Sequence, residues 1–348
     1  MTFTLPEDRV YIIAEAGVNH DGKIAKAKRL INIAADAKAD AVKFQTFDPD
    51  QVVTDKAPLA EYQKRTGAKS QKDMIRGLYL PPEAFRELKV YAENKGIDFI
   101  STPFDLDSAR FLASLGVQVM KVPSGEITNM PYLRLVASFK VFTIISTGMS
   151  TLEEIEEALV PFKAEKAPYA LLHCVSSYPA PVDQINLRAM KTMEDRFKVL
   201  VGYSDHTEGI AVALTAVVLG ARIIEKHFTV NRNDPGPDHA ASLEPSELKE
   251  MVRIIRDKDV LQNIELVQEA LGTVEKECQT CEINTRDVAR RSIVLARAAK
   301  KGEKLTQEML AILRPGTGMA PKLLEYILGK TIKRDLDAGE LLREDDIA

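Results

Sequence analysis

Residues 198–227, KVLVGYSDHTEGIAVALTAVVLGARIIEKH, contain the unit from which the fold can be worked out. Two short apolar runs, KVLVGYS and ARIIEKH, flank the apolar helical stretch GIAVALTAVVLGA. A strand, a helix and a second strand in this order are typical of a parallel sheet. The carboxyl ends of parallel strands lie at the same edge. We therefore expect His206 and His227, which stand at the ends of the two runs, to lie close together.

The same alternation repeats along most of the chain. Eight short β-rich runs are separated by amphipathic stretches: VYIIA, DAVKFQ, DFIST, VQVMKV, VFTIIS, YALLHC, KVLVGYS and ARIIEKH. Eight repeats predict an α/β fold, a closed (β/α)8 TIM barrel rather than an open doubly wound sheet. Its strands and helices should extend from about residue 10 to residue 257, within a barrel domain at residues 1–262.

One connection of the predicted barrel is unusually long. Residues 48–80 separate the second strand from its helix and include AEYQKRTGAKSQKDMI. The connection begins at the carboxyl end of a strand, which is where the active sites of TIM barrels form. We therefore expect this segment to cover the site.

The chain after the eighth helix changes character. Residues 263–288 are charged and indicate a linker, and residues 289–348 contain a degenerate repeat, GEKLTQEML and GELLREDDI, that aligns Gly302 with Gly339 and Leu305 with Leu342. Two copies of a turn followed by a short helix predict a small pseudo-symmetric domain. A domain of this size is marginally stable alone and gains stability by docking.

Composition narrows the classes of function. The chain has 348 residues, a net charge of −4 and no apolar segment long enough to cross a membrane, and its N-terminus does not resemble a signal peptide. Three cysteines do not form a disulfide framework, so we expect a cytoplasmic protein. The net negative charge gives no general attraction for nucleic acid. Small-molecule chemistry, without nucleic acid or a membrane as partner, is the expected function.

Polar residues stand at almost every predicted strand end. They are Glu15, Lys43, Gln45, Ser101, Thr102, Lys121, Ser124, Ser146, residues 173–178, Ser204, His206, Glu225 and His227. Buried polar groups without partners are costly, so a structural core does not explain such a set. The residues are expected to hold ligands.

His206 and His227 suit a divalent metal that acts as a Lewis acid, because two imidazoles leave positions open for water and substrate. Each histidine can equally be an ordinary hydrogen-bonding residue. Glu225 points to the same side of its strand as His227 and can orient a ligand or a bound water.

Lysines and hydroxyls at the same strand ends indicate an anion site. Lys43 and Lys121, with Ser124, Ser146 and Ser204, can seat a phosphate and a carboxylate. A lysine in a barrel can instead form a Schiff base, as barrel aldolases do. The pair Cys278 and Cys281 lacks a second pair of metal ligands, and its role stays open.

Nine motifs together resemble the sialic acid synthase family, which makes N-acetylneuraminate and related nonulosonates. They are IIAEAGVNHDG, AVKFQTF, FISTPFD, KVPSGEITNMPYL, ISTGM, LLHCVSSYPAP, VGYSDHTEGIA, EKHFT and GPDHAASLEP, and the C-terminal RRSIVLARAAKKGEKL and ILRPGTG are similar to the family's antifreeze-like (SAF, β-clip) domain. The resemblance implies condensation of phosphoenolpyruvate with an N-acylated mannosamine aldehyde, with water consumed and phosphate released. It also implies a domain-swapped homodimer.

The resemblance assigns roles residue by residue. It implies Mn2+ or Mg2+ on His206 and His227, and an arginine, Arg314, that the partner chain supplies to the sugar. The other implied sugar contacts are Gln45, Tyr178 and Asp238. The implied phosphoenolpyruvate contacts are Lys43, Thr102, Lys121, Ser124, Ser146, Ser176 and Ser204. Ser176 departs from the pattern, because some members carry Asn there, and its contact with the phosphate is a hydroxyl or is missing.

The implied reaction needs a carboxylate base. Positive charge that develops at C2 of phosphoenolpyruvate must be captured by water, and a nearby glutamate can take the proton of that water. Glu15 is the first candidate, Glu126 the second, and Glu225 completes the set of catalytic carboxylates.

Several alternatives remain open at this point. The sugar can be N-acetylmannosamine, which gives N-acetylneuraminate, its 6-phosphate, or a 2,4-diacetamido-trideoxy hexose, which leads to legionaminate or pseudaminate. A Schiff-base aldolase would use Lys121 or Lys43 and no metal. A carbohydrate- or ice-binding protein on a barrel that has lost its activity is the non-enzymatic alternative, and the full set of polar strand ends argues against it.

Overall fold

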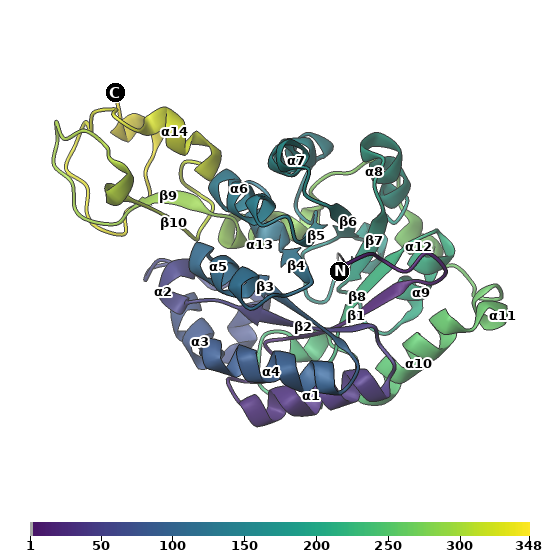
Figure 1. Cartoon of the computed structure of the whole chain (residues 1–348). Coiled ribbons are helices and arrows are strands. Elements are labelled where there is room, and N and C mark those ends of the chain that lie inside the picture. Colours follow the sequence, from purple (N-terminus) through teal and green to yellow (C-terminus); the bar gives the residue numbers. More distant parts are fainter. Residues whose placement is uncertain (1–2) are drawn as a thin grey trace.

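The computed structural model describes residues 3–348, apart from the side chains of Tyr62 and Arg65. Its central feature is a closed barrel of eight parallel strands in the order β1 to β8 (Figure 1). The strands are β1 Tyr11–Gly17, β2 Ala41–Thr46, β3 Asp98–Pro103, β4 Val119–Val122, β5 Phe142–Ser146, β6 Tyr169–Cys174, β7 Val201–Asp205 and β8 Ile223–His227. The predicted TIM barrel is confirmed.

Helices follow each strand and form the outer layer. They are α1 Ile24–Asp36, α4 Pro82–Asn94, α5 Leu106–Ser114, α6 Met130–Ser138, α7 Leu152–Glu165, α8 Ala189–Phe197, α9 Ala211–Val218 and α10 Pro245–Arg256. The start of helix α7 is defined by its local sequence. Thr151 accepts a hydrogen bond from Glu154 N, and the Glu154 side chain accepts one from Thr151 N. This is the capping box that STLEEIEEAL indicates.

Two apolar layers hold the barrel together. The larger core lies between the strands and the helices, for example around Leu30, Leu88 and Phe162. A smaller cluster, which includes Ile13, Ile100 and Ile144, fills the barrel at the amino ends of the strands. Since this end is packed with apolar side chains, the polar ends of the same strands must face the other mouth.

The long connection after β2 folds over that mouth. It contains α2 Pro49–Val52, the 3-10 helix η1 Glu61–Thr66 and α3 Gln71–Gly77, and we call residues 48–80 the lid. Val18 and Phe47, which lie just outside the lid, pack with Val52, Met74 and Ile75 in a separate apolar cluster. The lid is therefore anchored to the barrel loops, as a segment that covers the site requires.

The chain between barrel and C-terminal domain is ordered against the barrel. It forms α11 Lys258–Leu261, α12 Gln268–Leu271, the 3-10 helix η5 Thr280–Glu282 and α13 Ile283–Ala289. Backbone hydrogen bonds join Leu187 N to Ala270 O at 2.8 Å and Arg188 N to Leu271 O at 3.1 Å. The segment thus follows the barrel surface instead of spanning open solvent.

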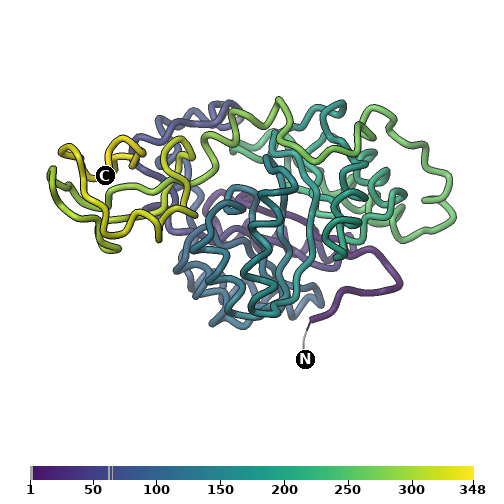
Figure 2. Tube along the Cα trace, turned by 90° about the horizontal axis from the view of Figure 1, so that it is seen from above, coloured from purple at the N-terminus to yellow at the C-terminus, as the bar shows by residue number. Residues whose placement is uncertain are grey.

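The C-terminal domain has its own core and lies beside the mouth of the barrel (Figures 1 and 2). It contains β9 Ser292–Leu295, β10 Leu310–Leu313 and α14 Leu324–Ile327, and β9 and β10 pair antiparallel. The predicted repeat is confirmed: the 3-10 helices η6 Gln307–Met309 and η8 Glu344–Asp346 occupy matching places, and Leu305 and Leu342 are both buried. Among the described residues, no helix is long and apolar enough to span a membrane.

Candidate active site at the barrel mouth

The alternation of side chains along the strands builds the floor of the pocket. Ile13, Ile144 and Ile223 belong to the apolar cluster inside the barrel. Two positions later the same strands carry Glu15, Ser146 and Glu225, and all three line the pocket. Successive side chains of a strand point to opposite faces, so residues two apart share the barrel interior. Two residues further along each strand, the barrel interior therefore changes from an apolar core to a polar site.

Four buried charges of alternating sign form the centre of this floor. Lys43 Nζ lies 2.8 Å from Glu15 Oε2 and 3.8 Å from Glu225 Oε2, and Lys121 Nζ lies 3.7 Å from Glu225 Oε1. The sequence of charges is thus Glu15, Lys43, Glu225, Lys121. Each ion has an opposite charge beside it, which is the condition for burying charges at acceptable cost.

Hydroxyl and amide groups complete the hydrogen bonds of these ions. Lys43 donates to Thr102 Oγ1 at 2.9 Å, and Lys121 donates to Ser146 Oγ at 2.6 Å. Ser204 donates to Glu225 Oε1 at 3.1 Å. The carboxylate of Glu15 also accepts a longer bond, at 3.3 Å, from Gln45 Nε2.

Burial separates the acid–base properties of the two carboxyl groups. Burial raises the pKa of Glu15 to about 7, although Lys43 opposes the shift. For Glu225 burial acts in the same direction, but Lys121 and Lys43 outweigh it and lower its pKa. Burial lowers the pKa of Lys121. Glu15 is consequently the carboxyl group suited to exchange a proton near neutral pH.

His206 and His227 lie together beside this floor, as predicted. Their ring centroids are 5.7 Å apart, and the ring of Tyr178 lies 4.2 Å from that of His206. The Nδ1 atom of His206 lies 2.7 Å from Val175 O, so this nitrogen carries the proton and Nε2 keeps a lone pair. Burial lowers the pKa of His206 to about 4 and that of His227 well below its usual value, so both rings are neutral.

The two neutral rings fit a divalent cation. Among the described residues, the buried Nδ1 of His227 has no hydrogen-bond partner, and a buried orphan of this kind is costly unless a ligand satisfies it. A backbone carbonyl that fixes the tautomer of His206 is also what metal-binding histidines usually have.

Serines and a glycine form the other end of the pocket. Ser124, Ser146 and Ser176 all line it, and Ser124 Oγ accepts a hydrogen bond of 2.9 Å from Gly148 N. A Cβ atom at Gly148 would lie 2.2 Å from Ser176 Oγ and 2.9 Å from Ser124 Oγ. Only glycine therefore allows the hydroxyls to come this close together.

The structure adds a buried carboxylate that the sequence did not reveal. Glu282, in η5, accepts hydrogen bonds from Met149 N at 2.6 Å and Ser176 N at 2.7 Å. The residue is fully buried. It therefore fixes the loops after β5 and β6, which carry Gly148 and Ser176. Its other oxygen accepts a local bond of 2.9 Å from Gln279 N, and nothing in that local pattern marks the role in the pocket, because Met149 and Ser176 lie more than 100 residues away.

Glu126 is placed differently from the expectation. It is fully buried and is not among the residues that line the pocket. Its Oε1 accepts a bond of 2.6 Å from Arg291 Nε and its Oε2 one of 2.7 Å from Asn129 Nδ2. Oε1 thus joins the C-terminal domain to the barrel and Oε2 is held within the barrel, so Glu126 does not fit the role of general base.

Arg314 reaches the pocket from the C-terminal domain. It lines the pocket of its own chain, where its backbone pairs with Val53 and its guanidinium lies 5.5 Å from the ring centroid of Phe104. The backbone bonds run from Arg314 N to Val52 O at 3.1 Å and from Thr54 N to Arg314 O at 3.1 Å. Within this single chain the C-terminal domain thus contributes to the pocket, and the supply of Arg314 by a partner chain stays a prediction.

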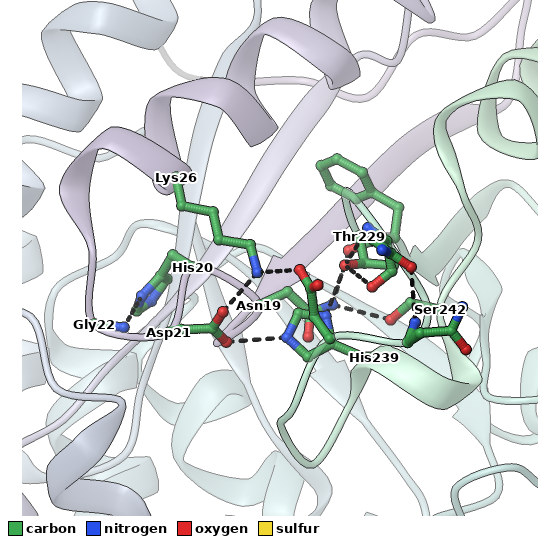
Figure 3. Close-up of polar contacts among 12 residues, drawn as sticks. Asn19, His20, Asp21, Gly22, Lys26, Thr229, His239 and Ser242 are labelled. Carbon is green, nitrogen blue, oxygen red and sulfur yellow. Dashed lines mark hydrogen bonds and ion pairs between the residues drawn. The ribbon is translucent and has the colours of Figure 1, made fainter.

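The loop that carries Asp238 is held by a polar network (Figure 3). Asp238 lines the pocket, and the neighbouring His239 lies 3.0 Å from Asp21 Oδ1 through Nε2 and 2.7 Å from Thr229 Oγ1 through Nδ1. Ligand atoms of Asp21, Asp234 and His239 come within 4.8 Å of one another, a spacing that can hold a cation. Lys26 Nζ already lies 2.6 Å from both Asp21 and Asp234. Its ammonium neutralises the two carboxylates, so the cluster acts as a support for the loop.

The other predicted site residues line one pocket. The pocket is lined by Glu15, Lys43, Gln45, Thr102, Lys121, Ser124, Ser146, Ser176, Tyr178, Ser204, His206, Glu225, His227, Asp238 and Arg314. Lid residues that the sequence did not single out join them, among them Gln63, Gln71, Met74 and Ile75. Their contribution depends on how the lid folds back, which no local pattern predicts.

Comparisons with known proteins show the family and the fold of the chain. The NeuB family matches residues 30–266, and the SAF domain matches residues 290–348. The N,N'-diacetyllegionaminic acid synthase of Campylobacter jejuni is 46% identical over 97% of this chain and 99% of its own length, and the N-acetylneuraminate-9-phosphate synthase of Homo sapiens is 33% identical over 96% and 92%. The crystal structure of the spore coat polysaccharide biosynthesis protein SpsE of Bacillus subtilis superposes with a TM-score of 0.85 at 35% identity, covering 100% of this chain and 97% of that one.

Proposed function

The chain belongs to the NeuB family and is a carbon–carbon bond-forming synthase, and from this premise we propose how its pocket works. In the proposed reaction, C3 of phosphoenolpyruvate bonds to the aldehyde carbon of an N-acylated amino sugar. Water adds at C2, and the phosphate leaves as inorganic phosphate. The product is a nonulosonate.

The observation that carries the proposal is the row of buried charges Glu15, Lys43, Glu225 and Lys121. Phosphoenolpyruvate is a small trianion, and it needs cations and hydroxyl donors in a confined space. Lys43 and Lys121, with Ser124, Ser146 and Ser204, offer both. The buried position strengthens each of these interactions because the local dielectric constant is low.

His206 and His227 would hold a divalent cation, Mn2+ or Mg2+. When bound, such an ion supplies Lewis-acid polarisation of the sugar aldehyde. Tyr178, whose ring packs on His206, orients that imidazole and faces the sugar. The Val175 carbonyl keeps His206 in one tautomer.

Glu15 is the proposed general base. Its pKa of about 7 lets it take a proton from the water that attacks C2, and the ammonium of Lys43 at 2.8 Å stabilises the carboxylate before the reaction. Glu225 stays ionised between two lysines and keeps Lys121 and Lys43 in place.

Gln45, Tyr178, Asp238 and Arg314 are the proposed contacts to the sugar. Two sugars have specific support. The relative with 46% identity is named for N,N'-diacetyllegionaminic acid, which favours a 2,4-diacetamido-trideoxy hexose. The human relative is named for a 9-phosphate product, which favours the 6-phosphate of N-acetylmannosamine. N-acetylmannosamine itself is the third sugar to test.

The homodimer and the cytoplasmic location expected from the sequence belong to the same proposal. In a dimer whose two chains exchange their C-terminal domains, the contacts of Arg314 with Val52 and Thr54 would form between the two chains.

The experiment that tests the proposed function measures inorganic phosphate released from phosphoenolpyruvate. Purified protein is incubated with Mn2+ and each of the three sugars, and the product is identified by mass spectrometry. Release that depends on one of the sugars supports the proposal. No release with any of them, from protein that binds phosphoenolpyruvate, would refute it. Borohydride inactivation in the presence of substrate would point to the Schiff-base aldolase instead.

A further inference from the structure

Gln71 presents an unused hydrogen-bond acceptor to the pocket. It is the first residue of α3 in the lid, it is 1% exposed, and it lines the pocket. Its Oε1 has no hydrogen-bond partner among the described residues. A buried acceptor without a donor costs about 1–3 kcal/mol, so its retention calls for a ligand that supplies one.

The neighbours of Gln71 decide which of its two amide atoms is left over. Gln71 Nε2 donates to Gln63 Oε1 at 3.1 Å, and the same Gln63 oxygen accepts from Ala60 N at 2.9 Å. Because the backbone of Ala60 can only donate, the Gln63 atom that faces it must be the oxygen. That oxygen in turn needs the NH2 group of Gln71, so the orientation of Gln71 is fixed and its carbonyl oxygen is the free atom.

Apolar residues share the face of α3 that carries Gln71, because Met74 and Ile75 follow it by three and four positions. Met74, Ile75 and Leu78 of the lid line the same pocket with Val52 and Phe47, and all five are buried in one apolar cluster. Such a wall favours methyl groups by about 0.8 kcal/mol for each buried carbon and disfavours hydroxyls and charges that it does not bond.

Two cations of the pocket lie on the barrel floor, and the third, Arg314, reaches the pocket beside the lid. Among the described side chains that line it, the positive groups are Lys43, Lys121 and Arg314. Lys43 and Lys121 are engaged on the barrel floor with Glu15 and Glu225. The guanidinium of Arg314 lies 5.5 Å from the ring centroid of Phe104. The side chains of α3 that line the pocket, Gln71, Met74 and Ile75, carry no charge and offer the sugar one acceptor and apolar carbon.

The length of the substrate relates this site to the reaction. The aldehyde carbon of the sugar must lie at the floor, where phosphoenolpyruvate and the two histidines meet. The far end of the sugar then extends toward the lid, whose residues line the same pocket. A group near C4 to C6 is therefore what Gln71 and its apolar wall would contact.

We propose that Gln71 determines sugar specificity by accepting a hydrogen bond from a second acylamino N–H, and that Met74 and Ile75 receive the acyl methyl and the deoxygenated C6 methyl. The substrate class is accordingly a 2,4-diacetamido-trideoxy hexose. This inference rests on the proposed synthase function and names the sugar that the same pocket selects.

The test compares the wild type with Gln71→Met, which keeps the length and volume of the side chain and removes the acceptor. The wild type should use the diacetamido sugar with a kcat/KM at least about tenfold above that for N-acetylmannosamine, and more above that for its 6-phosphate. Gln71→Met should lower kcat/KM for the diacetamido sugar about 10- to 100-fold and should reduce the preference, while the KM of phosphoenolpyruvate changes less. Gln51→Met is the matched control, since Gln51 lies in the same lid, bonds to Asp107 and does not line the pocket.

Two further measurements keep the proposal falsifiable if Gln71→Met folds poorly. Ile75→Ala should weaken the preference for the diacetamido sugar by removing methyl contacts. Binding of the reduced diacetamido hexitol, measured by calorimetry with phosphoenolpyruvate present, should be tighter than binding of N-acetylmannosaminitol. Equal loss for all three sugars in Gln71→Met, or a wild-type preference for N-acetylmannosamine or its 6-phosphate, would overturn the assignment while leaving the synthase function intact. Absence of phosphate release with every sugar would instead remove the proposed function on which the assignment rests.

Discussion

Arg291 and Glu126 form a buried ion pair between the C-terminal domain and the barrel, with Nε 2.6 Å from Oε1. Arg291 also donates to Val52 O at 2.6 Å in the lid and to Phe104 O after β3. One guanidinium therefore ties together the lid, two barrel loops and the second domain. The pocket is complete only while the contacts of Arg291 are formed.

Arg291→Met should destabilise the protein strongly, because it leaves the carboxylate of Glu126 buried without its partner. We expect a loss of about 3–5 kcal/mol in the free energy of unfolding, measured by urea denaturation. Arg134→Met is the matched control, since Arg134 pairs with Glu325 across the same two domains but on the surface, and its loss should change stability little. Equal effects of the two substitutions would show that the buried joint is not what holds the domains together.

Removal of divalent metal should abolish phosphate release, and Mn2+ or Mg2+ should restore it, because two imidazoles alone release such ions readily. His206→Ala and His227→Ala should lower kcat by at least about a thousandfold while the circular dichroism spectrum stays that of the wild type. Full activity after dialysis against a chelator would contradict the metal role. Loss of folding in both variants would favour a purely structural role for the two histidines.

Activity should depend on the ionisation of Glu15. Its pKa is raised to about 7, and a general base must be deprotonated to act. As the pH falls through about 7 the carboxylate takes up a proton, so kcat/KM for phosphoenolpyruvate should drop toward tenfold per pH unit below that value. Glu15→Gln should remove this activity at every pH. A flat profile between pH 6 and 8 would exclude Glu15 as the base, since the pKa of Glu225 is lowered and that residue stays ionised in this range.

Arg314→Ala should raise the KM of the sugar about tenfold or more and that of phosphoenolpyruvate less, because Arg314 reaches the pocket from the side of the lid. Arg297→Ala is the control in the same domain, as Arg297 is half exposed and pairs with Glu303. Mixing Arg314→Ala and His206→Ala chains, at a sugar concentration at which neither variant alone is active, identifies the donor of Arg314. Recovery of activity is expected because the proposed homodimer exchanges its C-terminal domains, whereas no recovery after demonstrated subunit exchange would mean that Arg314 acts within its own chain.

Glu282→Ala should affect phosphoenolpyruvate more than the sugar. It removes the acceptor of Met149 N and Ser176 N and loosens the loops at the serine end of the pocket. We expect the KM of phosphoenolpyruvate to rise about tenfold, with recovery of most of the loss in Glu282→Gln, which keeps one acceptor oxygen. A change in the KM of the sugar alone would contradict this positioning role.

The sequence by itself determined the barrel and its floor. Apolar runs of strand length that alternate with amphipathic helices specify a parallel closed sheet, and the period of two along each strand places Glu15 two residues beyond the apolar Ile13. His206 and His227 could be predicted as neighbours for the same reason, since β7 and β8 are adjacent. These predictions are correct because they depend only on alternation within one strand and on strands that follow one another both along the chain and around the barrel.

Only the tertiary structure decided how the site is closed. Glu126 comes shortly after β4, the strand that carries Lys121, yet its carboxylate turns to Arg291, 165 residues away. Glu282 and Gln71 carry no motif, and their roles arise when the linker packs on the β5 and β6 loops and the lid folds over the mouth. Docking of this kind depends on the summed fit of many side chains from distant segments, each worth little alone. A local pattern therefore predicts which residues face the pocket from the strands, but not which residues are brought to it by the lid, the linker and the second domain.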